Sequence, residues 1–158
     1  MLQLEDNTVY MTLNSRGVPG TFHWGIFITS SAPDGVYYHT TNRSGGWKLE
    51  FRPTANITQS LTLVLLYKIG LVSSHTPLKA NQVLRAVPAN GSASLRTGEA
   101  FTCRIWTKDA FVALHENGIV TLPADIDTLE RQAFAPARGL KPYIEQNRGG
   151  PAIVDSTD

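Results

Sequence analysis

Cysteine is almost absent from this chain of 158 residues, because Cys103 is the only one. A single cysteine excludes an internal disulfide, so the fold cannot depend on an oxidising compartment. The four histidines are scattered, and together with one cysteine they offer no close ligand pair at the spacing usual for a metal site. The sequence therefore predicts neither a bound metal nor a cofactor.

An excess of charge is also lacking. Lys and Arg number 14 against 13 Asp and Glu, for a formal net charge of +1, which argues against a nucleic-acid-binding surface or a polybasic membrane patch. The longest apolar stretch, residues 61–72, contains Lys68 and Gly70 and is too short to span a bilayer. The first seven residues lack the basic and then apolar pattern of a signal peptide. We expect a cytoplasmic protein with no stable membrane anchor and no nucleic-acid partner.

The sequence does contain a series of strands followed by helices. Alternating hydrophobicity and turn residues predict strands over residues 8–13, 21–29, 36–41, 47–52 and 60–71, although periodicity alone also allows a helix over the last of these. Helices are predicted over residues 76–87, 101–117 and 124–134. We predict an α+β fold with an antiparallel sheet of about five strands packed against the helix that carries Cys103. We expect residues 1–135 to form one domain, which carries the candidate catalytic residues described below, and residues 136–158 to form an irregular tail rich in Pro and Gly.

Two histidines on neighbouring predicted strands are the first candidates for chemistry. Side chains alternate along a strand, so a hairpin centred at Ser31 places His23 and His39 on one face of the sheet, whereas a slip of one residue would separate them. Cys103 lies in the first turn of its helix, where the helix N-terminus favours a thiolate and free amides can bind an oxyanion. If this helix packs against the histidine face, His23 accepts the thiol proton and His39 orients His23.

These residues also resemble a known family. The order His23-Trp24-Gly25-Ile26-Phe27, Asp34-Gly35, His39 and then Cys103 resembles the permuted papain-like family of lecithin:retinol acyltransferase and its phospholipase/acyltransferase relatives. The resemblance extends over about residues 21–114 and implies a circularly permuted papain-like fold. It also implies that Cys103 forms a thioester intermediate, that His23 is the general base and that His39 supports it.

Aromatic residues near the histidines are candidates for contacts with a substrate. We take Tyr37, Trp24 and Trp47 as candidate substrate-binding residues, with packing in the core as the alternative for each. His75 is expected in an exposed loop. His115, late in the Cys103 helix, suits a helix C-terminus better than catalysis.

The sequence therefore favours a cysteine-dependent acyl-transfer enzyme, either a hydrolase or an acyltransferase, that acts on a small-molecule or acyl-bearing substrate. One alternative is an amidase or peptidase on the same fold. A second is a non-catalytic binding domain in which Cys103 is only a small buried side chain, the commonest state of a free cysteine. The sequence leaves the acyl acceptor and the oligomeric state open.

Overall fold

The computed structural model describes residues 3–16, 20–43, 45–72 and 77–156. Its elements in chain order are β1 (Thr8–Ser15), β2 (Phe22–Thr29), β3 (Gly35–Thr41), β4 (Lys48–Thr54), the 3-10 turn η1 (Ile57–Gln59), β5 (Leu63–Leu71), α1 (Pro77–Ala86), α2 (Cys103–Glu116), α3 (Ile126–Glu145) and β6 (Ala152–Asp155). The predicted strands and helices are all confirmed, with ends shifted by a few residues except for α3. The loop predicted around His75 lies outside the described residues.

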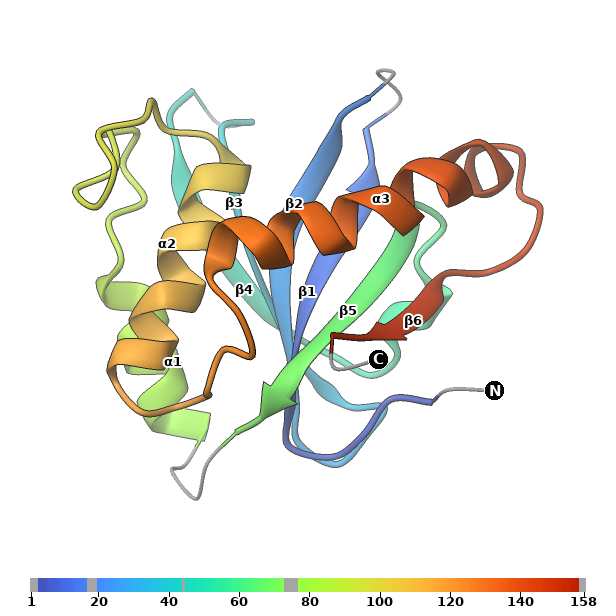
Figure 1. Cartoon of the computed structure of the whole chain (residues 1–158), viewed down its shortest axis with the longest axis horizontal. Helices are drawn as coiled ribbons and strands as arrows, with labels where there is room; N and C mark the ends of the chain where they lie inside the picture. The colour runs from blue at the N-terminus through green and yellow to red at the C-terminus, as the bar shows by residue number, and fades with distance from the viewer. Residues whose placement is uncertain (1–2, 17–19, 44, 73–76, 157–158) are drawn as a thin grey trace.

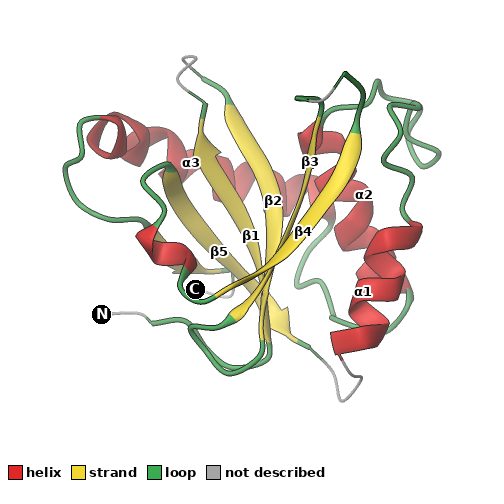
Figure 2. Ribbon diagram, turned by 180° about the vertical axis from the view of Figure 1, so that it is seen from behind, coloured by secondary structure: helices red, strands yellow, loops and turns green. Residues whose placement is uncertain are grey.

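The strands form one six-stranded sheet in the order β4-β3-β2-β1-β5-β6. The first five strands in this order are antiparallel to their neighbours, whereas β6 lies parallel to β5. The prediction of a purely antiparallel sheet is therefore wrong at this edge. Figure 1 shows α2 and α3 in front of the sheet, and Figure 2, seen from behind, shows the strands in front of the helices. The helices thus cover one face of an α+β fold.

The predicted irregular tail is the main error of the sequence analysis. Helix α3 continues through Pro136 and Pro142 to Glu145, and β6 follows it. A proline in the interior of a helix lowers helix stability by about 3 kcal/mol. The sequence therefore predicts that this helix ends near residue 134. The helix continues because the buried side chains of one face pack against the sheet. These include Leu129, Ala133, Ala137 and Ile144. Burial of that stripe over five turns offsets the two lost backbone hydrogen bonds.

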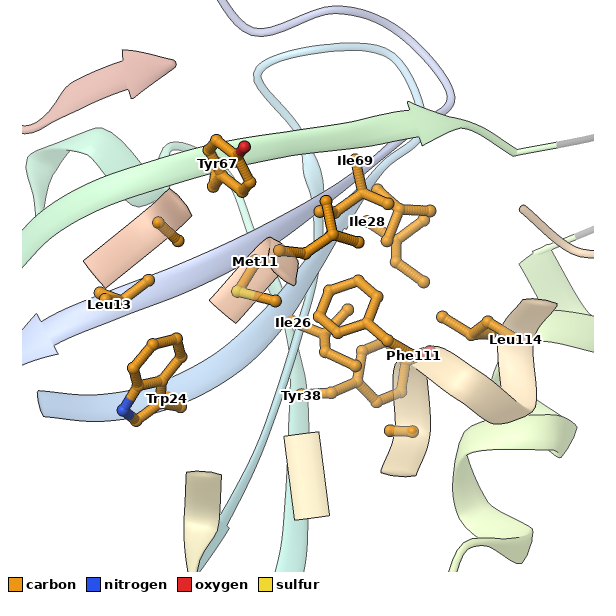
Figure 3. Packing of buried hydrophobic residues seen from close by; sticks show 14 of the residues in the cluster. Met11, Leu13, Trp24, Ile26, Ile28, Tyr38, Tyr67, Ile69, Phe111 and Leu114 are labelled. Carbon is orange, nitrogen blue, oxygen red and sulfur yellow. The ribbon is translucent and has the colours of Figure 1, made fainter. Parts of the chain in front are cut away.

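The main core lies between the sheet and the helices. Alternate residues of β1 and β2 point toward the helices, among them Met11, Leu13, Trp24 and Ile26, and Phe111 of α2 packs into the same cluster (Figure 3). A smaller cluster on the opposite face joins side chains of the sheet to η1, with Tyr10, Phe27, Ile57, Leu63 and Leu66 buried. The histidines of β2 and β3 alternate with the core residues, so they lie on the face opposite the helices. The expectation that the Cys103 helix packs against the histidine face is therefore wrong (Figure 1).

Helix α2 is fixed to α3 by a buried cation. The ammonium group of Lys108 is 2.6 Å from an Asp127 oxygen and 2.8 Å from a Glu130 oxygen, and Lys108 is nearly inaccessible. Arg104 also pairs with Glu130. Because removal of either partner would leave a buried charge uncompensated, these contacts fix how the first turns of α2 sit on the fold. No helix in the described part of the chain is long and apolar enough to cross a membrane.

Candidate active site

The imidazoles of His23 and His39 are in direct contact. Nε2 of His23 lies 2.8 Å from Nδ1 of His39, and the two rings are nearly perpendicular at 86°. Strands β2 and β3 pair with Gly25 opposite His39, which is two residues away from the register expected for a turn centred at Ser31. A shift of two residues keeps the same face, so the predicted pairing of the imidazoles is confirmed.

Glu50 sets the orientation of this pair. It lies opposite His39 in the β3–β4 register, and its Oε1 is 3.5 Å from His39 Nε2. A carboxylate favours a hydrogen on the nitrogen that faces it, so we assign the neutral His39 a hydrogen on Nε2 and a lone pair on Nδ1. His23 must then donate through Nε2. Its own Nδ1 is left with a lone pair, the form that can accept a proton.

Sequence reasoning did not identify Glu50. The strand that carries it was predicted, but the length of the turn before that strand does not fix its register against β3. The neighbouring Arg43 guanidinium lies 3.0 Å from the same Glu50 oxygen. This pairing holds the carboxylate beside His39.

Tyr37 lies against the face of the His39 ring. Its ring stacks on the imidazole with the centroids 4.6 Å apart and the planes 14° from parallel. Burial raises the pKa of the Tyr37 phenol to about 12, and the charge of a Cys103 thiolate contributes to the rise. Tyr37 is therefore a neutral hydroxyl at physiological pH. It packs on the face of the His39 ring, whereas His23 meets the ring at its Nδ1 edge.

Cys103 is the first residue of α2. Thr102 caps the helix, its hydroxyl accepting a hydrogen bond from the amide of Ile105 at 3.1 Å. Within the described residues the amides of Cys103 and Arg104 have no acceptor, as expected for the first turn of a helix. The Cys103 side chain is only 3% exposed and belongs to the main core. It also lines a cavity of about 540 Å³ together with His23, His39 and Trp47.

The aromatic candidates separate in the structure. Trp47 lines the Cys103 cavity and packs on Phe101 with the ring centroids 4.9 Å apart, and Tyr37 lies on His39. Trp24 instead points into the main core beside Phe22, because it alternates with His23 along β2. The assignment of Trp24 to the substrate site is therefore wrong. His115 lies in the last turn of α2 and accepts a hydrogen bond from the Leu122 amide.

A second cavity borders the histidines on the open face of the sheet. It measures about 820 Å³, and Tyr37, Glu50, Arg52 and Asn14 line it together with both imidazoles. His23 and His39 thus lie between this polar cavity and the smaller one that contains Cys103. A molecule in either space reaches the same pair of rings.

Burial keeps both imidazoles neutral. Desolvation, together with smaller contributions from His39, Arg16 and Arg43, lowers the pKa of His23 to about 4. Desolvation also lowers the pKa of His39, although Glu50 opposes this effect. A neutral His23 is a proton acceptor at physiological pH. A thiolate formed beside it would raise its pKa, since an opposite charge favours the imidazolium.

The depressed pKa of His23 predicts a loss of stability in mild acid. In the unfolded chain His23 titrates near 6.5 and in the folded chain near 4, so its contribution to stability is complete above pH 6.5 and is lost as the pH falls through 4. The free energy of unfolding changes by at most about 1.4 kcal/mol per pH unit for this one proton. Urea unfolding between pH 7 and pH 5 measures it. His23→Gln should flatten the curve, and equal slopes for the two proteins would contradict the assignment.

Gly25 allows the close approach of the strands beside the histidine pair. A Cβ at this position would lie 2.8 Å from the Tyr38 carbonyl oxygen and 2.9 Å from the Tyr37 ring. We expect Gly25→Ala to cost about 1–3 kcal/mol, as overpacking does, and to disturb the ring stacked on His39. Gly46→Ala is the matched control, because a Cβ there meets nothing within 4 Å. Urea midpoints measure both variants, and equal midpoints would refute the close approach.

Among the described residues, no group of three His, Cys, Asp or Glu side chains could hold a metal ion. No curated protein and no solved structure matches the chain. One protein family, described as a family of unknown function (DUF6540), matches residues 9–121. The matched part runs from β1 to the loop after α2, so it contains His23, His39, Glu50 and Cys103, whereas α3 and β6 follow it. The chain belongs to DUF6540, a family of unknown function.

Proposed function

We propose that this protein is a cysteine-dependent acyl-transfer enzyme in which Cys103 is the nucleophile, His23 the general base and His39 the residue that orients it. One observation carries the proposal: a thiol in the first turn of a helix and a hydrogen-bonded pair of neutral histidines line the same cavity. A nucleophile, a base and an orienting group are the parts that covalent acyl transfer requires. Their side chains come from three separate elements, β2, β3 and α2.

The proposed reaction begins with transfer of the Cys103 thiol proton to Nδ1 of His23 as Sγ bonds to the carbonyl carbon of the substrate. The carbonyl π electrons move to oxygen, and the amides of Cys103 and Arg104 donate hydrogen bonds to that oxyanion. The intermediate collapses to a thioester. The bond to the leaving group breaks, and the leaving group takes the proton from His23.

The second half of the reaction releases the acyl group. Water, an amine or a hydroxyl compound gives a proton to His23 and attacks the thioester carbon. The C–S bond then breaks, and the sulfur recovers the proton. With water the enzyme is a hydrolase, and with another acceptor it is an acyltransferase. An amide substrate would make the same machinery an amidase or peptidase.

We also propose a circularly permuted papain-like fold. Support comes from the chain order, in which the strands with His23 and His39 precede the helix that begins with Cys103. The resemblance to the lecithin:retinol acyltransferase family is weakest at the nucleophile. Those proteins have Asn-Cys-Glu-His-Phe where this chain has Thr102-Cys103-Arg104-Ile105-Trp106, so a phospholipid substrate does not follow from the resemblance.

A binding domain without catalysis is the second candidate. It is favoured by the 3% exposure of Cys103 and its place in the main core, since a buried thiol in apolar surroundings is usually inert. The two candidates differ in the reactivity of one sulfur atom.

Incubation with 4-nitrophenyl acetate followed by mass spectrometry of the intact protein tests the proposal. We expect one acetyl group per chain, located on Cys103 by peptide mapping and lost again in buffer as the thioester is hydrolysed. Cys103→Ala should remain unmodified and folded. A wild-type protein that gains no acetyl group on Cys103 would support the binding domain instead.

A further inference from the structure

We propose that the 820 Å³ cavity binds an anionic group, a carboxylate or a phosphate, of the acyl substrate, and that Arg52 is the residue that holds it. The proposal rests on the acyl-transfer function for the reacting carbonyl, but the anion site itself rests on the charges of this cavity. It names a class of substrate that the nucleophile and its base do not specify.

The charge balance of the cavity favours an anion. Glu50 is its one carboxylate among the described lining residues, and Arg43 already pairs with it at 3.0 Å. Arg52 lines the same space and has no ion pair within the described residues. Its guanidinium is therefore the uncompensated cation of the cavity. A planar guanidinium suits carboxylate and phosphate groups, because it can donate two parallel hydrogen bonds.

The position of Arg52 relates the anion to the histidine pair. Arg52 lies opposite Tyr37 in the β3–β4 register, two residue pairs along from His39 and Glu50. Residues two apart on a strand share a face and are separated by about 7 Å. A substrate held at Arg52 therefore has its charge one strand over from His39, and its chain must extend past the imidazoles to bring the carbonyl to Cys103 in the smaller cavity.

An unpartnered acceptor on the far side of the cavity indicates a second contact. Asn14 lies opposite His23 on β1, and its side-chain nitrogen donates to the Thr62 hydroxyl at 3.0 Å. The Asn14 Oδ1 atom is buried, and no group in the described part of the chain donates a hydrogen bond to it. A buried acceptor without a donor is costly. An N–H or O–H group of the substrate would satisfy it beside His23.

Binding to the full-length Cys103→Ala protein, which cannot turn over, tests the inference. The ligands are N-acetyl-4-aminobutyrate, N-acetyl-3-aminopropyl phosphate and the neutral N-acetyl-4-aminobutyramide, each titrated by calorimetry. We expect at least one anion to bind about tenfold or more tightly than the neutral amide, the ratio that about 1.4 kcal/mol gives. The tighter of the two anions identifies the carboxylate or the phosphate as the source.

The preference should disappear when Arg52→Gln is added and persist when Arg138→Gln is added, because Arg138 is exposed on α3. Equal affinities for charged and neutral ligands, a preference unchanged by Arg52→Gln, or no binding of either anion would each overturn the inference. An anion preference in a protein whose wild-type Cys103 never acquires an acetyl group would refute acyl transfer and leave the anion site. Acetylation without the preference would refute only the anion site.

Discussion

Replacing His23 by Ala slows acetylation of Cys103 by about 10²- to 10⁴-fold at neutral pH, the range that loss of a general base costs. The imidazole is neutral there, since its pKa is lowered to about 4, and in the proposed reaction its Nδ1 lone pair takes the thiol proton. Without it, the Cys103 thiol has no imidazole to take its proton as the sulfur attacks. The rate of 4-nitrophenolate release under single-turnover conditions measures the effect.

Three further variants make this result specific. His39→Gln should cost less than His23→Ala, because an amide still hydrogen-bonds to His23 Nε2. His115→Gln serves as the matched control, a histidine of the same helix that lies about 18 Å along the axis from Cys103. Cys103→Ala should release no burst of product. Acetylation of His23→Ala at the wild-type rate would show that this imidazole is not the base.

Removing the Phe111 ring is expected to cause the largest loss of stability. Phe111 has no exposed surface, and Figure 3 shows its ring close to Ile26 of β2 and Tyr38 of β3. Phe→Ala substitutions in cores cost about 3–5 kcal/mol, from lost transfer energy and from the cavity left behind. The free energy of unfolding of Phe111→Ala in urea, compared with the wild type, measures this loss.

Leu95→Ala is the control for that experiment. Leu95 is 89% exposed, so its truncation should change the free energy of unfolding by less than about 0.5 kcal/mol. If Phe111→Ala does not fold, Phe111→Leu leaves a smaller cavity and should show an intermediate loss. Similar free energies for Phe111→Leu, Leu95→Ala and the wild type would mean that α2 does not depend on this contact.

The histidine pair could be predicted because it depends on local rules. Alternation along β2 and β3 places His23 and His39 on one face for any register of the right parity, and the observed two-residue offset does not change that parity. Helix α2 was predictable for the same reason: apolar residues such as Ile105 and Phe111 recur at helical spacing, and Gly118 follows the helix. Each prediction used residues that lie close together in the chain.

Features that depend on distant parts of the chain could not be predicted in this way. Nothing near Glu50 in the sequence indicates that it faces His39, because the length of the turn between β3 and β4 does not fix their register. Helix α3 passes Pro136 because its buried face packs on strands far earlier in the chain. Strand β6 is four residues long and forms only beside β5, so its own sequence carries little signal.

The order of strands in the sheet also sets the order in which the site assembles. His23 and His39 lie 16 residues apart on consecutive strands. Strand β5, in contrast, pairs with β1, and β2, β3 and β4 lie between these two strands in the sequence. Loop closure costs more entropy for longer loops. We therefore expect pulsed hydrogen exchange during refolding to protect the β2–β3 amides before those of α2. The proposed proton acceptor would then be in place before the proposed nucleophile of α2 reaches it.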